Sequence, residues 1–326
     1  MKKYNIAFAG FRHGHIYGLY DLVKKYNNIN IAGAWEDDAE SISEAQQNGV
    51  EFTYKTYEEL LNDKRVDIVA IGNYYGARGE MVISALKAGK HVIADKPLCI
   101  KMEEAESAEK ISREQNLKIG LMLDLRHNKN VLSAMRIIEN GTIGKINNIY
   151  FGGQHPLMYG KRPQWYFEQG NHGGTINDIA IHGIDLVRRF TKSEIKEIKA
   201  VHCWNCFAAE KPEFHDSAQF MLELGSGAGV IADVSYCAPD TLGFSMPTYW
   251  EFKVWGTAGM LMFNANADGV EMYINGENKM LKMDGVNSES NYLDDFLHDI
   301  EADVFDNTDS LLMSTKAALA VQERAE

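Results

Sequence analysis

Three polar residues share one face of a predicted helix in the middle of the chain. Asp178, His182 and Asp185 stand at i, i+4 and i+7 after the pair Gly173-Gly174, among apolar neighbours. A histidine beside a carboxylate can be held in one tautomer and can act as a general base. Asp178 as a helix N-cap and His182 as a hydrogen-bonded core residue form the structural alternative. The same spacing occurs in zinc sites, but no further ligand stands at a recognisable spacing, so we expect no metal here.

A second candidate for chemistry is the tripeptide Asp95-Lys96-Pro97. It follows His91–Ala94, an apolar run that predicts a buried parallel strand. Ligands of parallel α/β sheets bind beyond the carboxyl ends of the strands, so Lys96 is placed to reach such a ligand. Pro97 restricts the backbone there, and a cis Lys96–Pro97 bond is one way to do so. A surface lysine before a turn proline is the alternative.

The segment Gly10–His15 (GFRHGH) follows the first predicted strand, Asn5–Ala9, and precedes a helix. Backbone N–H groups and the helix dipole at such a turn bind the pyrophosphate of a dinucleotide. The spacing departs from G-x-G-x-x-G, because Arg12 and His15 occupy the second and third glycine positions. A plain strand–helix turn is therefore the alternative. The cofactor-binding residues predicted in this loop are Gly10, Arg12, His13, Gly14 and His15.

An acidic residue ends the second predicted strand, Asn30–Trp35. Glu36 stands where a carboxylate can accept hydrogen bonds from the ribose diol of a bound adenosine. Asp37 and Asp38 follow, and three acids would repel a 2′-phosphate. If a dinucleotide binds, NAD is favoured over NADP. A solvated acidic turn is the alternative.

The pattern of elements changes near residue 125. Before it, strand and helix signals alternate, which predicts a doubly wound parallel α/β (Rossmann) domain over residues 1–125. After it, longer strand-like runs are joined by glycine turns such as Gly225–Gly227 and Gly256–Gly259. These joints predict hairpins, and so an α+β domain over 126–326 with a large, mostly antiparallel, open sheet. The last helix, about 310–326, could pack back on the first domain.

Composition sets limits on the partners. The chain has 326 residues, of which 45% are hydrophobic and 24% charged, and its net charge is −13. These are ordinary globular values. An acidic chain without a basic block is a poor candidate for binding nucleic acid or anionic membranes, and no apolar run approaches the ~20 residues of a membrane-spanning helix. The composition favours a protein with a small-molecule ligand.

The four cysteines predict no disulfide framework. Cys99, Cys203, Cys206 and Cys237 are too few for one in a chain of this length, so we expect a reducing, cytoplasmic location. Cys203 and Cys206 form a lone C-x-x-C on a predicted strand. Residues three apart on a strand point to opposite faces, so this pair predicts no metal site.

Three further residues could contact a substrate. Arg126 follows a strand at the domain junction and could bind hydroxyl groups, although a structural role fits equally well. Trp165 and Tyr166 could stack on the face of a sugar. Packing in the core is the commoner role of such aromatic side chains.

Taken in order, these motifs resemble the glucose–fructose oxidoreductase / inositol dehydrogenase family (Gfo/Idh/MocA). Asp95-Lys96-Pro97 matches its E-K-P signature with aspartate for glutamate, and Gly173–Asp185 matches its G-G-x-x-x-D-x-x-x-H-x-x-D helix. The likeness extends over nearly the whole chain. It departs at Asn73, where members usually carry a Thr-Pro-Asn-like run, and at Arg78, where a histidine often stands.

The resemblance implies roles for particular residues. Lys96, Asp178 and His182 fall on the family's catalytic positions, and Gly10, Glu36, Asn73 and Asp95 fall near its cofactor contacts. It implies an NAD-dependent oxidoreductase that acts on a secondary alcohol of a sugar, cyclitol or derivative. His182 would be the general base, Lys96 would hydrogen-bond the same oxygen, and Asp178 would orient His182 or hold a neighbouring hydroxyl.

Two other functions stay open at this point. The family also covers redox-neutral glycosidases and epimerases, which use the cofactor only transiently. The irregular glycine loop also suits a non-enzymatic dinucleotide or sugar sensor, although a sensor needs no general base. The resemblance further implies a homodimer or homotetramer, paired through the open face of the second domain's sheet.

Overall fold

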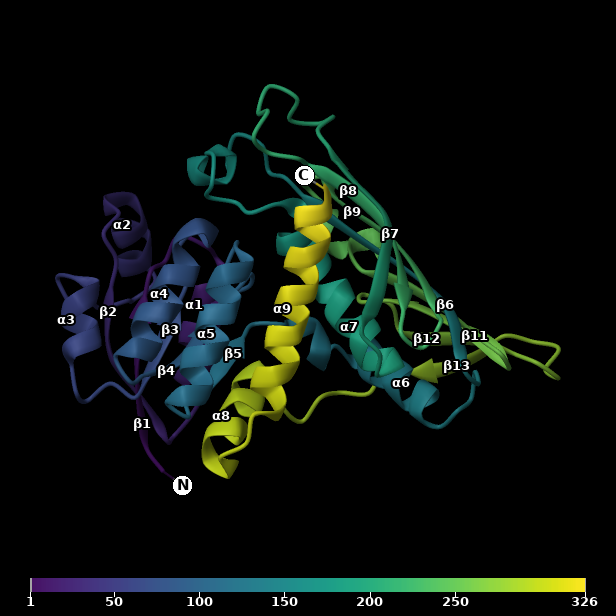
Figure 1. Cartoon of the computed structure of the whole chain (residues 1–326), viewed down its shortest axis with the longest axis horizontal. Coiled ribbons are helices and arrows are strands. Elements are labelled where there is room, and N and C mark those ends of the chain that lie inside the picture. The colour runs from purple at the N-terminus through teal and green to yellow at the C-terminus, as the bar shows by residue number, and fades with distance from the viewer. Residues whose placement is uncertain (1, 326) are drawn as a thin grey trace. The chain divides into compact units, whose positions relative to one another are not determined.

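The computed structural model describes residues 2–325, which fall into two compact units. The first unit comprises the chain up to Met122 together with Gly170–Gly173 and Leu293–Thr315. The second comprises Leu123–Gln169, Gly174–Tyr292 and the chain from Lys316. Figure 1 labels most of the helices and strands of both.

The first unit is built on a parallel five-stranded sheet in the order β2-β1-β3-β4-β5. Its strands are short, and the three central ones are almost entirely buried, as expected of strands covered on both faces. The doubly wound fold predicted for this part of the chain is confirmed. The strands are β1 (Tyr4–Ala9), β2 (Ile29–Trp35), β3 (Ile68–Ile71), β4 (His91–Ala94) and β5 (Ile119–Leu121).

Helices connect these strands. One of them, α2, was not expected from the apolar pattern, because Ala45 is its only buried side chain; Asp38 caps its first turn by accepting from the Ser41 N–H at 2.9 Å. A further helix, α8, packs Phe296 against Gly120 of β5. The helices are α1 (His15–Val23), α2 (Ala39–Gln47), α3 (Tyr57–Asn62), α4 (Tyr75–Lys87), α5 (Met102–Glu114) and α8 (Tyr292–Ala302).

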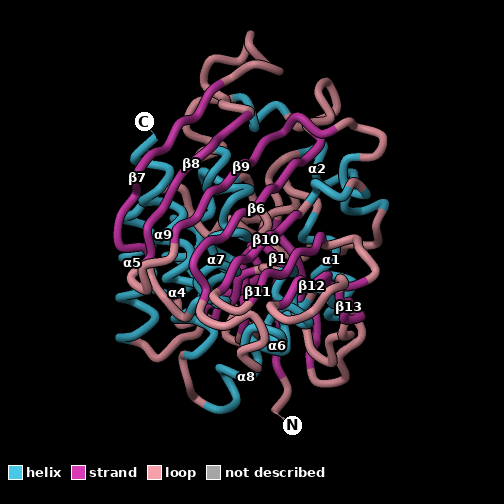
Figure 2. The backbone as a smooth tube through the Cα atoms, turned by 90° about the vertical axis from the view of Figure 1, so that its right-hand side faces the viewer, coloured by secondary structure: helices cyan, strands magenta, loops and turns pink. Residues whose placement is uncertain are grey.

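The second unit contains an eight-stranded sheet in the order β13-β12-β11-β10-β6-β9-β8-β7. Figure 2 shows β7, β8, β9 and β6 side by side. All neighbours are antiparallel except β6 and β9, which agrees with the mostly antiparallel sheet predicted. The strands are β6 (Ile146–Pro156), β7 (Ile195–Trp204), β8 (Ser217–Leu224), β9 (Gly229–Ala238), β10 (Glu251–Gly256), β11 (Gly259–Asn264), β12 (Gly269–Ile274) and β13 (Leu281–Asp284).

Helices α6 (Lys129–Glu139) and α7 (Ile181–Thr191) pack on one face of this sheet. Gly183 of α7 lies directly on Phe151 of β6, where an added Cβ would lie 2.2 Å from the ring. On the opposite face the cross-strand pair Met221 and Ile231 is about half exposed. The sheet therefore has one face covered by helices and one open within the described chain.

The last helix, α9 (Asp306–Ala325), carries residues of both units. Thr308 exchanges hydrogen bonds with the backbone of Ile119 in the first unit. Gln322 accepts from the N–H of Ile176 in the second. Within residues 2–325, no helix combines the length and apolarity required to cross a bilayer.

Candidate active site

The loops after β1 and β3 lie against each other. Gly10 has φ +87°, and a Cβ at this residue would lie 2.6 Å from the backbone nitrogen of Asn73. The N–H groups of Arg12 and His13 donate to the Gly72 carbonyl at 3.1 and 3.3 Å. In this strand order, the connections from β1 and β3 leave in opposite directions, which is where open α/β sheets bind ligands. Only glycine permits this close approach at position 10.

The same loop leads into α1. Gly14 occupies the N-cap position of α1 and has no side chain to accept from the first amides of the helix. A helix N-terminus directs N–H groups and the positive end of its dipole toward an anion. The close approach of Gly10 to Asn73 and the uncapped first turn of α1 together fit the pyrophosphate of a dinucleotide.

Glu36 joins the end of β2 to this loop. Its buried carboxylate accepts from the N–H of Phe11 at 2.7 Å and from Nε of Arg12 at 2.9 Å. It also accepts from the N–H groups of Asp37 and Asp38. The Arg12 guanidinium pairs with Asp37 as well, at 2.7 Å. Glu36 therefore fixes the conformation of the loop that begins at Gly10.

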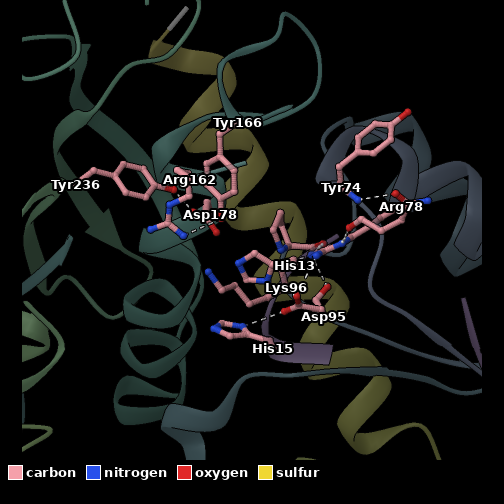
Figure 3. A network of polar contacts seen from close by, with 12 residues as sticks. His13, His15, Tyr74, Arg78, Asp95, Lys96, Arg162, Tyr166, Asp178 and Tyr236 are labelled. Carbon is pink, nitrogen blue, oxygen red and sulfur yellow. Dashed lines mark hydrogen bonds and ion pairs between the residues drawn. The ribbon is translucent and has the colours of Figure 1, made fainter. Parts of the chain in front are cut away.

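Asp95 is the centre of a buried polar cluster at the end of β4, seen in Figure 3. Its carboxylate lies 2.5 Å from Nδ1 of His13, 3.1 Å from Nδ1 of His15 and 2.9 Å from Nη2 of Arg78. Asp95 and Arg78 are fully buried, whereas His15 is about half exposed. The cluster ties the loop after β1 to the loop after β4.

The charges of this cluster follow from its contacts. Burial alone would raise the pKa of Asp95, but Arg78, His13 and His15 hold that pKa well below its usual value. Burial lowers the pKa of His13 to about 4, although the neighbouring Asp95 carboxylate acts to raise that pKa. At neutral pH, His13 is therefore uncharged and donates its Nδ1 hydrogen to the carboxylate.

His13, His15 and Asp95 have ligand atoms close enough together to hold a metal ion. Arg78 argues against one, because its guanidinium donates to the same carboxylate and would repel a cation. We therefore assign this cluster to loop organisation.

Arg78 also holds the backbone on both sides of Lys96. Its Nη1 donates to the carbonyls of Asp95, Lys96 and Pro97, and its Nε donates to the carbonyl of Asn73 at 2.7 Å. The Lys96–Pro97 bond is cis, and the Lys96 side chain is buried. Arg78 thus positions the residues that follow both β3 and β4.

In the second unit, the predicted helix begins differently from expectation. Residues Ile176–Ala180 form a π-helical turn, and α7 starts at Ile181. Single π turns are frequent at functional sites, and this one contains Asp178. Because it widens the helix, Asp178 and His182 are not related by a regular α-helical turn.

Asp178 is buried and accepts a hydrogen bond from the Tyr236 hydroxyl on β9. Burial and the neighbouring carboxylate raise the pKa of Tyr236 well above its usual value, so the phenol remains protonated as a donor. Figure 3 shows Arg162 and Tyr166 beside this pair. The Arg162 guanidinium lies 4.7 Å from the centre of the Tyr166 ring and donates to the Pro156 carbonyl at 2.8 Å.

The other residues predicted here are also buried. His182 has its Nδ1 3.9 Å from the Asp124 carboxylate and its ring 5.5 Å from that of Trp250. Arg126 forms a two-point ion pair with Asp185, at 2.8 and 2.5 Å. Trp165 and Tyr166 lie in a 3₁₀ turn with their ring centres 4.1 Å apart.

Sequence reasoning missed the parts played by Arg78, Tyr236 and Arg162. Arg78 was noticed only as a departure from the family pattern, and no role was predicted for Arg162. Tyr236 stands 58 residues from Asp178, and nothing local in the sequence signals that contact. Knowledge of the strand order would have been needed to find it.

Two family models match most of the chain. The model described as an oxidoreductase family with an NAD-binding Rossmann fold matches residues 5–122, and that of the GFO/IDH/MocA C-terminal domain matches residues 131–262. The chain belongs to the Gfo/Idh/MocA family. Its first unit is thus the family's NAD-binding Rossmann domain, as the sequence motifs predict.

Two dehydrogenases resemble this Gfo/Idh/MocA chain at below 30% identity. It is 29% identical to the myo-inositol 2-dehydrogenase of Thermotoga maritima over 152 residues, which are 47% of this chain and 44% of the relative. It is 27% identical to the inositol 2-dehydrogenase/D-chiro-inositol 3-dehydrogenase of Lactiplantibacillus plantarum over 238 residues, which are 70% and 63%. Each match spans less than two thirds of the relative's own length.

Solved structures share the fold. A putative oxidoreductase from Erwinia carotovora atroseptica superposes with a TM-score of 0.89 at 22% identity, covering 99% of both chains. A levoglucosan dehydrogenase in complex with NADH and levoglucosan gives 0.82 at 18% identity, covering 99% of this chain and 97% of that one. At these identities the likeness establishes the architecture of this family member.

Proposed function

We propose that this chain is an NAD-dependent oxidoreductase that moves a hydride between nicotinamide and a secondary alcohol of a sugar, cyclitol or derivative. The observation that carries the proposal is the burial of Asp178 in the π turn and of His182 at the start of α7, in a chain with an NAD-binding Rossmann domain. Buried ionisable groups are uncommon without a partner or a function, and a histidine is the commonest general base.

Each candidate residue has a separate task in this proposal. His182 takes the proton of the substrate hydroxyl, and Asp124, 3.9 Å from its Nδ1, favours the charged imidazolium that results. Lys96 donates a hydrogen bond to the same oxygen and stabilises negative charge as the proton leaves. Asp178, oriented by Tyr236, accepts a hydrogen bond from a neighbouring hydroxyl.

The dinucleotide, when bound, supplies the acceptor or donor of the hydride. Residues of the Gly10–His15 loop and Asn73 would hold its pyrophosphate side, and Asp95 would keep that loop in place through His13 and His15. Arg126, Trp165 and Tyr166 remain candidates for the substrate wall, with Arg126 acting from its ion pair to Asp185.

NAD rather than NADP is the cofactor we propose. Arg12 is paired with Glu36 and Asp37, and its third acidic neighbour, Asp38, lies 3.6 Å away. Three carboxylates around one guanidinium leave net negative charge at this rim, which opposes a 2′-phosphate. Titration calorimetry with both nucleotides should give tighter binding of NAD, and equal or tighter binding of NADP would contradict this choice.

The reaction is tested by following NADH absorbance with a panel of alcohols. The names of the relatives described above suggest which alcohols to include: myo-inositol, D-chiro-inositol and levoglucosan. Net NADH formation with at least one of them supports the proposal. Consumption of substrate without net NADH would instead favour a redox-neutral epimerase or glycosidase. Absence of any nicotinamide nucleotide binding would favour a sensor.

The open face of the eight-stranded sheet is the surface proposed for a homodimer or homotetramer. Met221, Ile231 and Trp255 are exposed there, and they line a groove together with Tyr150 and Lys253. Exposed apolar patches of this kind mark association surfaces. A second copy of the chain would cover them.

A further inference from the structure

Cys206, Asp216 and Cys237 form a cluster in the second unit that the proposed reaction does not use. Cys206 follows β7, Asp216 precedes β8, and Cys237 lies near the end of β9. Their ligand atoms, one from each residue, all lie within 4.8 Å of one another. The C-x-x-C motif does not predict this cluster, because Cys203 is buried near Gln322 while Cys206 is exposed.

Asp216 is a buried carboxylate held by neutral donors. Its Oδ2 accepts from the N–H groups of Cys206, Phe207 and Ala208, at 3.1, 2.7 and 2.8 Å, and its Oδ1 accepts from the Ser217 hydroxyl at 2.8 Å. Within the described chain no cationic side chain pairs with it. A buried negative charge that no cation neutralises favours the binding of a cation.

The two thiols face this carboxylate from the solvent side. Sγ of Cys206 lies 3.8 Å from Oδ1 of Asp216, and Oγ of Ser217 lies 3.6 Å from Sγ of Cys237. Both cysteines are exposed, so their side chains can rotate and a metal can reach them. Zn–S bonds of about 2.3 Å at a tetrahedral centre put two sulfurs about 3.8 Å apart, so closure requires a shift of about 1 Å at most.

We propose that Cys206, Asp216 and Cys237 bind a thiophilic divalent cation of the zinc class, with solvent in the fourth position. Binding forms two metal–thiolate bonds and one metal–carboxylate bond. The two thiol protons are released to solvent, so no oxidant or reductant is needed. The backbone amides that hold Oδ2 remain in place and orient the carboxylate, as outer hydrogen bonds do in metal sites.

The cluster is connected to Asp178 through its neighbours. The Tyr236 N–H donates to the Asp216 carbonyl at 2.7 Å, and the hydroxyl of the same tyrosine donates to Asp178. Thr175, at the start of the π turn, donates to the carbonyl of His215. Cys237 follows Tyr236 in the chain, and the Asp216 carbonyl accepts from the Tyr236 N–H. A metal bound to Asp216 and Cys237 would therefore restrict the motion of Tyr236.

The site is tested on the full chain, reduced with a phosphine and freed of metal by a chelator. Zinc is titrated against a chromophoric chelator, and cobalt(II) is used as a spectroscopic probe. We expect one zinc per chain at this site, a thiolate-to-cobalt charge-transfer band, and two thiols that react with an aromatic disulfide reagent only when metal is absent. Because each thiol must lose its proton when it binds the metal, affinity should increase as the pH is raised.

Variants assign the binding to this cluster. Cys206→Ser and Cys237→Ser should each weaken zinc binding at least ~10-fold and remove the cobalt band. Cys99→Ser, at a buried cysteine of the first unit, should change neither, and His15→Gln tests the other potential cluster, around Asp95. Zinc binding that survives both cysteine variants, or that is lost in His15→Gln, would overturn the proposal. So would fully reduced thiols that take up no zinc.

Discussion

At the scale of single residues, the first unit depends on one buried charge pair. Arg78 and Asp95 are both fully buried, and Arg78 also donates to three carbonyl groups around Lys96 and to that of Asn73. Local sequence reasoning found Asp95 and Lys96 because they belong to a motif at the end of a strand. It could not assign Arg78, because its partner stands 17 residues further along and is reached only through the sheet.

Arg78→Met should destabilise the protein by about 3–5 kcal/mol, because it leaves the Asp95 carboxylate buried without its cation. The free energy of urea unfolding measures this. Adding Asp95→Asn to Arg78→Met should recover part of the loss, since the unpaired charge is then removed. A loss below ~1 kcal/mol for Arg78→Met would show that the pair is not the main support of these loops.

Stability should fall as the pH is lowered from about 6.5 to about 4. The pKa of His13 is about 4 in the folded protein, against 6.5 as its ordinary value, so the unfolded chain binds more protons between these limits. Urea unfolding at pH 7 and pH 4.5 should show the difference. His13→Gln should reduce it by up to ~3 kcal/mol, whereas His298→Gln, at an exposed histidine of α8, should not. Equal pH dependence in the two variants would contradict the buried neutral state of His13.

At the scale of elements, the sequence predicted which segments of the site form strands and helices, but it did not predict their local geometry. The helix that carries His182 was expected from Asp178 onward, but its first turn is a π turn. An apolar repeat at helical spacing does not distinguish an α from a π turn. The contact of Tyr236 with Asp178 depends in turn on the register of β9 beside β6, which the pattern of side chains leaves undetermined.

Gly10→Ala should abolish dinucleotide binding at concentrations where the parent chain saturates. The added Cβ would lie 2.6 Å from the Asn73 nitrogen, at a φ of +87° that alanine disfavours. Gly49→Ala is a matched control, because φ there is +78° and nothing lies within 4 Å of the added atom. Calorimetry with NAD should therefore detect binding in Gly49→Ala and none in Gly10→Ala. Undiminished binding in Gly10→Ala would place the cofactor elsewhere.

At the scale of the whole molecule, the fold class could be predicted from the sequence because the patterns that indicate it recur along the chain. Alternating buried strands and helices predicted the parallel sheet, and glycine turns between long strands predicted the antiparallel one. The parallel pair within the eight-stranded sheet, β6 with β9, was not predicted, because strands far apart in the chain become neighbours only after the sheet is assembled.

The open sheet face makes a separate prediction about assembly. Met221→Glu combined with Ile231→Glu should convert an oligomer to a monomer, because both side chains are exposed, opposite each other and apolar. Met313→Glu, at an exposed methionine of α9, should leave the mass unchanged. Light scattering after size exclusion measures the mass. An oligomer that persists in the double variant would show that another surface pairs.

The proposed chemistry is tested most directly by the rate of hydride transfer in single turnovers, measured with an alcohol that yields NADH. His182→Gln and Lys96→Met should each slow this step by about 10²–10⁴-fold while calorimetry shows NAD still bound. Lys87→Met and His298→Gln, at exposed residues, serve as controls. Parent-like transfer rates in His182→Gln and Lys96→Met would show that these side chains do not carry the reaction.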